Sequence, residues 1–479
     1  MPDDLVPAGK PTSDTANQGG RRRPGVSLTE GEPRRHIVKL AGYVMLGSIA
    51  TMTFQLADAY FVAQLGTQNL AALALTLPVV MILHAIAIGL GTGVTAVISR
   101  AYGRGDMERA RVLTTDSITL GFAIALVFAV VGHATMDPLF RVMGTTEAML
   151  PLVESYMDVW YYGMPFMVVP LIANAVIRAF GDAKFPSMIM ATSAVLNIVL
   201  DPILIFGAFG IPAMGLQGAA VALLLSRLVT LTASLAVLHY RLHALDYRRP
   251  TMARLKESWA ALLHIGLPAT GTQMISPVSS AILTSLVASY GATAIAAYGV
   301  AIRIEMFALI LTMALSISIA PFVGQNAGSG QMHRVRNALS FSNKVAMLYG
   351  LAVAVLLAVA GRLIVGGFSN DASVVDVATA YMWIVPVSYG AMGVMNVSSS
   401  CLNALAKPMP AMAIGLSKSL FVQIPMAYLG AALWGIEGVF AGMAASTLIV
   451  ACAAFVLSRR AVAIDPVTAS SGPATAPVS

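Results

Sequence analysis

Charged residues are scarce in this chain. Asp, Glu, Lys and Arg make up 11% of its 479 residues, hydrophobic residues make up 57%, and the mean hydropathy is +0.79. A soluble globular domain carries roughly 25% charged residues, so this chain lacks the polar surface that would keep it in water. The composition argues against a soluble protein and predicts a membrane protein.

Cysteine is almost absent too. Cys401 and Cys452 are the two cysteines, and each lies inside an apolar stretch, so neither a disulfide framework nor a set of cysteine metal ligands is predicted. The chain has no Walker sequence, and the Gly-X-Gly run at 103–105 follows no predicted strand, which argues against a nucleotide site. His, Asp and Cys do not cluster as a membrane-embedded enzyme requires. We therefore expect a protein that is not an enzyme and uses neither a cofactor nor a structural metal.

Apolar segments long enough to cross a bilayer recur along almost the whole chain. A spanning helix needs about 20 mostly apolar residues, and a segment in lipid must be helical to satisfy its backbone. We predict an all-α polytopic membrane protein with about twelve transmembrane helices. They lie near 38–62, 70–99, 112–134, 155–178, 186–207 and 217–239, and then near 260–289, 293–324, 338–360, 378–401, 411–433 and 438–458.

A polar break near the middle divides these spans into two halves. The start of the chain is also polar and rich in Pro, Gly and Arg, as disordered segments are. The predicted organisation is a disordered cytoplasmic tail (1–36), an N-terminal six-helix bundle (37–240), a cytoplasmic linker (241–259), a C-terminal six-helix bundle (260–459) and a second cytoplasmic tail (460–479).

Basic residues fall on alternate loops. The formal net charge is +7, which in a soluble protein could indicate a nucleic-acid partner. In a membrane protein, Lys and Arg in short loops mark the cytoplasmic side, and here they group after every second span and before the first. We expect a multi-pass protein of the bacterial inner (plasma) membrane with both termini in the cytoplasm, and no nucleic-acid partner.

The chain also repeats itself with a shift of 225 residues. Segment 61–111 lies on 286–336, so that Gly66 meets Gly291 and Gly103 meets Gly328. A second echo is Met-Gly-Leu-Gln-Gly (214–218) against Trp-Gly-Ile-Glu-Gly (434–438). Because each half has six spans, both copies keep one orientation and are related by a pseudo-two-fold axis along the membrane normal. Internal repeats of this kind are typical of secondary transporters.

Several loops and spans resemble one transporter family. They include Leu-Ala-Asp-Ala-Tyr-Phe-Val-Ala-Gln-Leu-Gly (56–66), Arg-Ala-Tyr-Gly-Arg-Gly-Asp (100–106), Arg-Ala-Phe-Gly-Asp (178–182), Asn-Ile-Val-Leu-Asp-Pro (197–202), Gly-Gln-Asn-Ala-Gly-Ser-Gly (324–330) and Asn-Ala-Leu-Ala-Lys-Pro (403–408). Together these motifs are similar to those of the multidrug and toxic compound extrusion (MATE) transporters. The resemblance implies two six-helix bundles in a V around a central cavity, and efflux of organic cations in exchange for H⁺ or Na⁺.

The resemblance also implies where the coupling cation binds. Asp58, Asn174, Asn197 and Asp201 are similar to the N-terminal cation site of the branch related to DNA-damage-inducible protein F. Another bacterial branch has acidic residues in the seventh and tenth spans, where this chain offers Gln, Ser and Asn instead. That departure favours a site in the first half.

The same residues stand out on physical grounds. An ionisable residue inside a span is costly and is a functional candidate by default. Asp58 lies in the first predicted span, and Asp201 in the fifth lies four residues after Asn197, so the latter two share a helix face. Asn174 of the fourth span could complete an oxygen-rich site for H⁺ or Na⁺. Alternatively, these residues are helix-end acids wetted by the outer interface, or polar contacts between spans.

A substrate cavity is expected between the halves. Its predicted lining includes Gln55, Gln273, Met274 and Asn396. The predicted function is secondary active export, by a monomer in the bilayer, of amphipathic and often cationic organic compounds or drugs. The alternative is a flippase for lipid-linked saccharides, whose cavity would carry several basic residues, whereas mid-span cations look few here, with Arg303 the main exception. Arg303 and Glu305 are the lower-ranked candidates and could simply pair.

Overall fold

A computed structural model describes residues 25–147 and 149–463 of the chain, and over those ranges its regular structure is entirely helical. The first half comprises α1 (Pro33–Ala63), α2 (Thr67–Gly103), α3 (Met107–Val142), α4 (Leu150–Tyr162), α5 (Met164–Ala179), α6 (Lys184–Phe206), α7 (Gly215–Ala236) and η1 (Val237–Arg241). The second half comprises α8 (Met252–Ala288), α9 (Ala292–Ala308), α10 (Ile310–Gly328), α11 (Met332–Gly366), α12 (Ala372–Ile384), η2 (Val385–Ser388), α13 (Tyr389–Ala404), α14 (Pro408–Leu416), η3 (Ser417–Val422) and α15 (Gln423–Ala463).

The helices account for the predicted number of spans. In the described residues, nine helical stretches are long and apolar enough to cross a membrane, and α4 with α5, bent by 49°, makes a tenth. The stretch Pro408–Ala463 turns back at Trp434 and Gly435, whose backbone is not helical, and so provides two spans. α8, with 37 residues, is also long enough to cross a bilayer. The prediction of about twelve transmembrane helices is confirmed.

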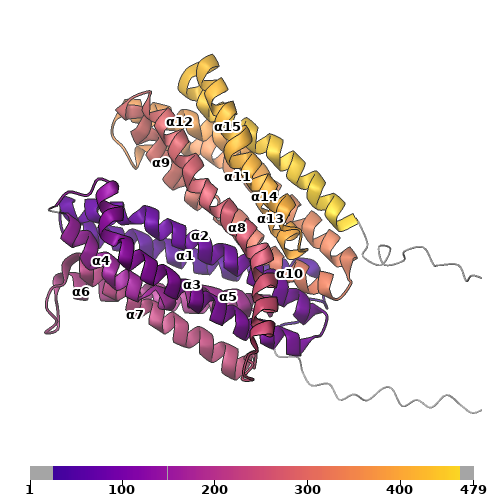
Figure 1. Cartoon of the computed structure of the whole chain (residues 1–479). Coiled ribbons are helices and arrows are strands. Elements are labelled where there is room, and N and C mark those ends of the chain that lie inside the picture. The colour runs from indigo at the N-terminus through magenta and orange to yellow at the C-terminus, as the bar shows by residue number, and fades with distance from the viewer. Residues whose placement is uncertain (1–24, 148, 464–479) are drawn as a thin grey trace, which may run out of the picture.

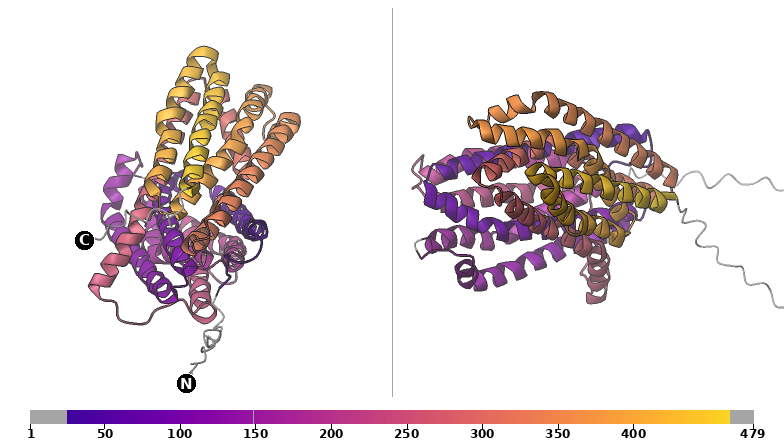
Figure 2. Two further views of the ribbon diagram at one scale, coloured as in Figure 1. Left: turned by 90° about the vertical axis from the view of Figure 1, so that its right-hand side faces the viewer. Right: turned by 90° about the horizontal axis from the view of Figure 1, so that it is seen from above.

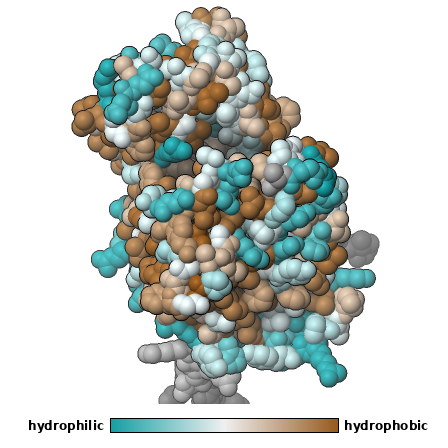
Figure 3. Space-filling model, turned by 90° about the vertical axis from the view of Figure 1, so that its left-hand side faces the viewer, coloured by the Kyte–Doolittle hydropathy of each residue, from teal (hydrophilic) through white to brown (hydrophobic). Residues whose placement is uncertain are grey.

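The two halves form two bundles that meet at one end and separate at the other (Figure 1). Both ends of the described chain lie where the bundles meet, which we name the closed end; the opposite end is the open end. Figure 2 shows the same two bundles from two further directions. Viewed from the open end, the surface is hollowed between the bundles (Figure 3).

Equivalent turns confirm the predicted repeat. Gly66 precedes α2 with φ 102° and ψ 169°, and Gly291 precedes α9 with φ 103° and ψ 176°. A left-handed φ of this size is open to glycine because it has no Cβ. The glycines of the second repeated motif also share one backbone conformation, with φ of 57° at Gly215 and 61° at Gly435.

The two copies also contact each other symmetrically at the closed end. A Cβ on Gly103 of α2 would lie 2.0 Å from the carbonyl oxygen of Gln325, and a Cβ on Gly328 of α10 would lie 2.3 Å from that of Arg100. The shift of 225 residues exchanges these two contacts. α2 and α10 therefore cross on the pseudo-two-fold axis, at a distance that only glycine allows.

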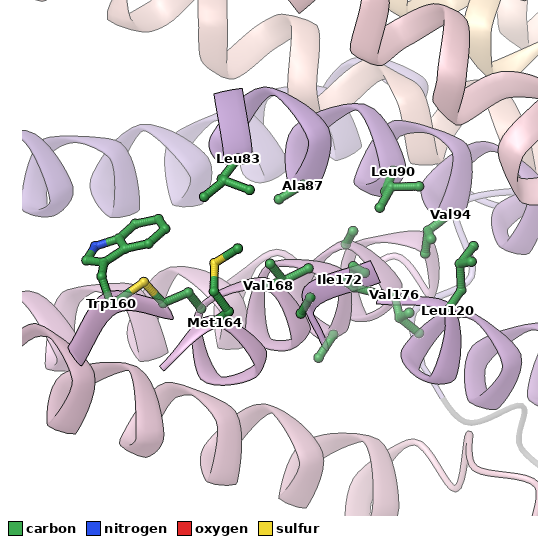
Figure 4. Packing of buried hydrophobic residues seen from close by; sticks show 14 of the residues in the cluster. Leu83, Ala87, Leu90, Val94, Leu120, Trp160, Met164, Val168, Ile172 and Val176 are labelled. Atoms are coloured by element: carbon green, nitrogen blue, oxygen red, sulfur yellow. The ribbon is translucent and has the colours of Figure 1, made fainter. Parts of the chain in front are cut away.

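The core of the first bundle forms along one face of α2. Leu83, Ala87, Leu90 and Val94 recur at helical spacing and point towards α4 and α5 (Figure 4). Facing them are Trp160, Met164, Val168, Ile172 and Val176. The other faces of α2 are free to meet the second bundle, and α2 packs along α8 and α10.

Residues 25–32, which we name the bridging segment, join the two bundles at the closed end. The backbone N–H of Val26 donates to the carbonyl of Phe180 in the first bundle at 2.9 Å. The N–H of Leu28 donates to Oε1 of Gln325 in the second bundle at 2.9 Å, and Nε2 of Gln325 donates to the carbonyl of Ala179 at 2.9 Å. Leu28 is buried.

Arg334 of α11 fastens the same segment. Its guanidinium donates to the backbone carbonyls of Gly31 at 2.8 Å, and of Leu28 and Glu30 at 3.2 Å each. Of the predicted disordered tail 1–36, residues 1–24 lie outside the described residues. The bridging segment is ordered because its backbone groups find partners in both bundles, and α1 then begins at Pro33.

Candidate functional site

A buried carboxylate lies inside the first bundle. Asp201 of α6 is 0% exposed. The Asn197 amide forms two hydrogen bonds when its nitrogen is oriented towards Asp201. The nitrogen then donates to Oδ2 of Asp201 at 3.2 Å, and the oxygen accepts from the backbone N–H of Leu223 at 3.2 Å. Oδ1 of Asp201 has no hydrogen-bond partner among the described residues. A buried acceptor left open in this way is a position for a proton or a cation.

A second carboxylate lies near the first. Asp58 of α1 is half-buried, and α1 packs along α6. Its side chain makes no hydrogen bond within residues 25–147 and 149–463, and it lies within electrostatic range of Asp201. Tyr156 of α4 is buried within range of both carboxylates. Sequence reasoning missed Tyr156, because a tyrosine in an apolar helix gives no signal of what it faces.

Asn174 of α5 has a hydrogen-bond partner of its own. Its Oδ1 accepts from the Ser234 hydroxyl of α7 at 3.1 Å, and its side chain is 3% exposed. Nowhere in the described chain does a hydrogen bond join it to Asp58, Asn197 or Asp201. The grouping of Asn174 with Asp58, Asn197 and Asp201 therefore stays a prediction, whereas Asn197 and Asp201 are joined by a hydrogen bond.

The predicted cavity residues lie in both bundles. Gln55 of α1 is exposed one turn before Asp58. In the second bundle, Gln273 and Met274 of α8 are exposed, and Asn396 of α13 is half-buried, with its backbone carbonyl accepting from the Ser316 hydroxyl at 3.1 Å.

The expectation that Arg303 is the main mid-span cation is wrong. Arg227 lies in the middle of α7, half-buried, and lines a small cavity with Thr51 of α1 and Asn197 of α6. Lys418 lies in the distorted turn η3, between α14 and α15. Both are single basic residues inside apolar stretches, and this isolation is the signal that could have identified them.

Glu305 of α9 is partnered by tyrosines instead of by Arg303. Tyr381 and Tyr389, each 1% exposed, donate their hydroxyls to Oε2 of Glu305, the latter at 3.3 Å. Lys418 lies within electrostatic range of the same carboxylate. Arg303 is exposed. The second bundle thus holds a polar cluster of its own, which the sequence did not predict.

Comparison with known proteins agrees with this architecture. The MatE family model matches residues 44–203 and 268–429. A curated protein named FAD transporter, of Shewanella oneidensis, is 34% identical over 87% of this chain and 92% of its own length. The probable multidrug resistance protein YoeA of Bacillus subtilis is 28% identical over 76% of this chain and 79% of its own.

Solved structures share the fold. The Vibrio cholerae MATE transporter VcmN in its bent form is 30% identical, covers 90% of this chain and 97% of that one, and superposes with a TM-score of 0.85. The two-part family match spans both repeats, and members of this family are transporters of small organic compounds and not enzymes. The chain is a multi-pass membrane protein that belongs to the MatE family of multidrug and toxic compound extrusion transporters.

Proposed function

We propose that this chain is a secondary active antiporter that exports amphipathic, often cationic organic compounds in exchange for H⁺, with Na⁺ as the alternative coupling ion. The observation that carries the proposal is the buried Asp201, with one open carboxylate oxygen, beside Asp58. The chain would act as a monomer in the bacterial inner membrane. Its closed end would face the cytoplasm, because the basic loops and both chain ends lie there.

The coupling follows from the electrostatics of two neighbouring acids. In a low-dielectric interior, two negative charges side by side disfavour each other, so the pair holds a proton more readily than an isolated acid does. Asp58 and Asp201 would titrate jointly. A proton that enters from the open end would remove the charge that holds a cationic substrate, and the substrate would leave. Na⁺, which prefers oxygen ligands, could use the carboxylates and the Asn197 amide instead.

A second candidate is export of a phosphate-bearing aromatic compound such as FAD. The similarity to a protein named FAD transporter supports it, and so does Arg227, a cation inside the first bundle. The same arginine and Lys418 weaken the sequence-based argument against a flippase for lipid-linked saccharides, which relied on the scarcity of mid-span cations.

Efflux from proteoliposomes tests the coupling site. Ethidium export would be driven by an imposed H⁺ or Na⁺ gradient, with Asp201→Asn and Asp58→Asn compared with Asp376→Asn. Asp376 is an exposed acid of the second bundle, ion-paired with Arg362. We expect each site variant to abolish gradient-driven export while the control keeps it. Export at the wild-type rate by the Asp58→Asn, Asp201→Asn double variant would remove both acids from the mechanism.

A further inference from the structure

Arg227 lies near the middle of α7, an apolar helix long enough to cross a membrane. It follows the first residue of α7, Gly215, by twelve positions, which at 1.5 Å per residue is about 18 Å. Half the hydrocarbon thickness of a bilayer is about 15 Å. A basic residue at this depth is costly unless it faces a partner or a polar cavity.

This guanidinium has no hydrogen-bond acceptor among residues 25–147 and 149–463. Among the described residues, Arg227 makes no ion pair and no hydrogen bond. Two hydroxyl groups line the same cavity and donate to backbone carbonyls: Thr51 to Gly47 at 2.9 Å, and Ser193 to Ser226 at 3.1 Å. Its five N–H donors therefore remain available to a bound group.

The acids of the first bundle do not neutralise Arg227. The Asn197 side chain of α6 accepts from the backbone N–H of Leu223 in α7, so these two residues lie at the same level. Along α7, Arg227 lies one turn from this level towards the closed end. Along α6, Asp201 lies one turn from it towards the open end. Two turns separate Asp201 from Arg227, about 12 Å along the helix axes. His84 of α2 is the ionisable neighbour of the arginine. It is exposed, and it belongs to the helix of the first bundle that packs against α8 and α10 of the second.

The small cavity does not hold a substrate by itself. Its volume is about 10 Å³, room for about one water. Arg227 is only half-buried, and its neighbour His84 lies on the helix that faces the second bundle. Asn197 and the acids lie farther towards the open end than Arg227.

We propose that Arg227 forms a subsite for the phosphate of an amphipathic aromatic substrate whose ring system occupies the hollow between the bundles. A guanidinium matches a phosphate because its planar N–H groups donate to two oxygens at once. This inference rests on the second candidate function, export of a phosphate-bearing aromatic compound, and assigns the residue that binds the phosphate. The acid pair keeps its separate role of holding the coupling ion.

Two fluorescent probes isolate the contribution of the phosphate. Riboflavin and riboflavin 5′-phosphate share one ring system and differ in the phosphate group. Their binding to the purified full chain in lipid nanodiscs would be measured by flavin fluorescence. For the wild type we expect the phosphate form to bind at least about tenfold more tightly, equivalent to 1.4 kcal/mol. Equal affinities for the two probes would overturn the proposal.

Substitution then assigns the preference to one residue. Arg227→Gln should abolish the preference for the phosphate form and leave riboflavin affinity within about twofold, because only the charged contact is lost. Arg227→Lys should keep part of the preference. Arg303→Gln, the matched change at an exposed arginine of the second bundle, should keep all of it. Riboflavin binding by each variant reports that the protein is folded.

The outcomes separate this inference from the transport proposal. An unchanged preference in Arg227→Gln places the phosphate elsewhere and refutes the subsite. In Asp201→Asn we expect the phosphate preference to remain while gradient-driven export is lost. If export also survives in Asp201→Asn, the proposed coupling fails, whereas the binding result at Arg227 stands or falls by its own measurement.

Discussion

The contact between the bundles at the closed end can be weakened by one substitution. Gln325 is 0% exposed, accepts from the Leu28 N–H and donates to the Ala179 carbonyl. Gln325→Leu keeps a similar volume and removes both polar atoms. It leaves one backbone donor and one backbone acceptor buried without a partner while the end is closed. When the bundles separate there, both groups reach water, so the penalty falls on the closed state alone.

The size of the effect follows from the two orphaned groups. Each buried, unsatisfied backbone group costs about 1–3 kcal/mol, so the closed state loses roughly 2–6 kcal/mol. Since 1.4 kcal/mol is a factor of ten, the ratio of closed to opened molecules should fall by roughly 30-fold or more. A contact that holds one state over another is expected to shift populations in this way.

Distance measurements across the closed end test this prediction. Spin labels would replace Lys184 and His333, two exposed residues of different bundles, after Cys401 and Cys452 are changed to alanine. Double electron–electron resonance should show a population with a longer distance between the two labels in Gln325→Leu than in the otherwise unchanged protein. Gln331→Leu is the matched control, because the Gln331 side chain makes no hydrogen bond in the described structure. An unchanged distance distribution in Gln325→Leu would refute the reasoning.

Three further predictions concern the same framework. Arg254→Ala should destabilise the protein by roughly 3–5 kcal/mol, since it leaves the 1%-exposed Asp116 without its 3.0 Å ion pair; thermal unfolding in detergent measures this, and no loss would contradict it. Gly103→Ala should shift the closed end open in the same distance assay, because its Cβ would overlap the Gln325 carbonyl, whereas Gly299→Ala, with nothing within 4 Å, should not. Reporter fusions at 111 and 336 should both read cytoplasmic and a fusion at 291 periplasmic; opposite readings at 111 and 336 would contradict the parallel repeat.

The sequence alone determined the class of fold, the number of spans and the repeat. Lipid permits only hydrogen-bonded helices across its core, so apolar length translates directly into spans. The repeat was readable because its glycines serve backbone positions: Gly66 and Gly291 need a left-handed φ, and Gly103 and Gly328 sit where the bundles touch. Asp201 and Asn197 were predictable as neighbours because both lie on one helix, one turn apart.

Only the tertiary structure showed which side chains of different helices contact each other. In a transmembrane helix the side towards lipid is as apolar as the side towards the bundle, so periodicity does not reveal orientation. The sequence therefore did not show that the side-chain oxygen of Asn174 accepts from the Ser234 hydroxyl. It gave no sign that Tyr156 lies near both acids or that residues 25–32 join the bundles. Whether a mid-span cation such as Arg227 meets an acid or remains open depends on which helices become neighbours, and only the folded chain settles that.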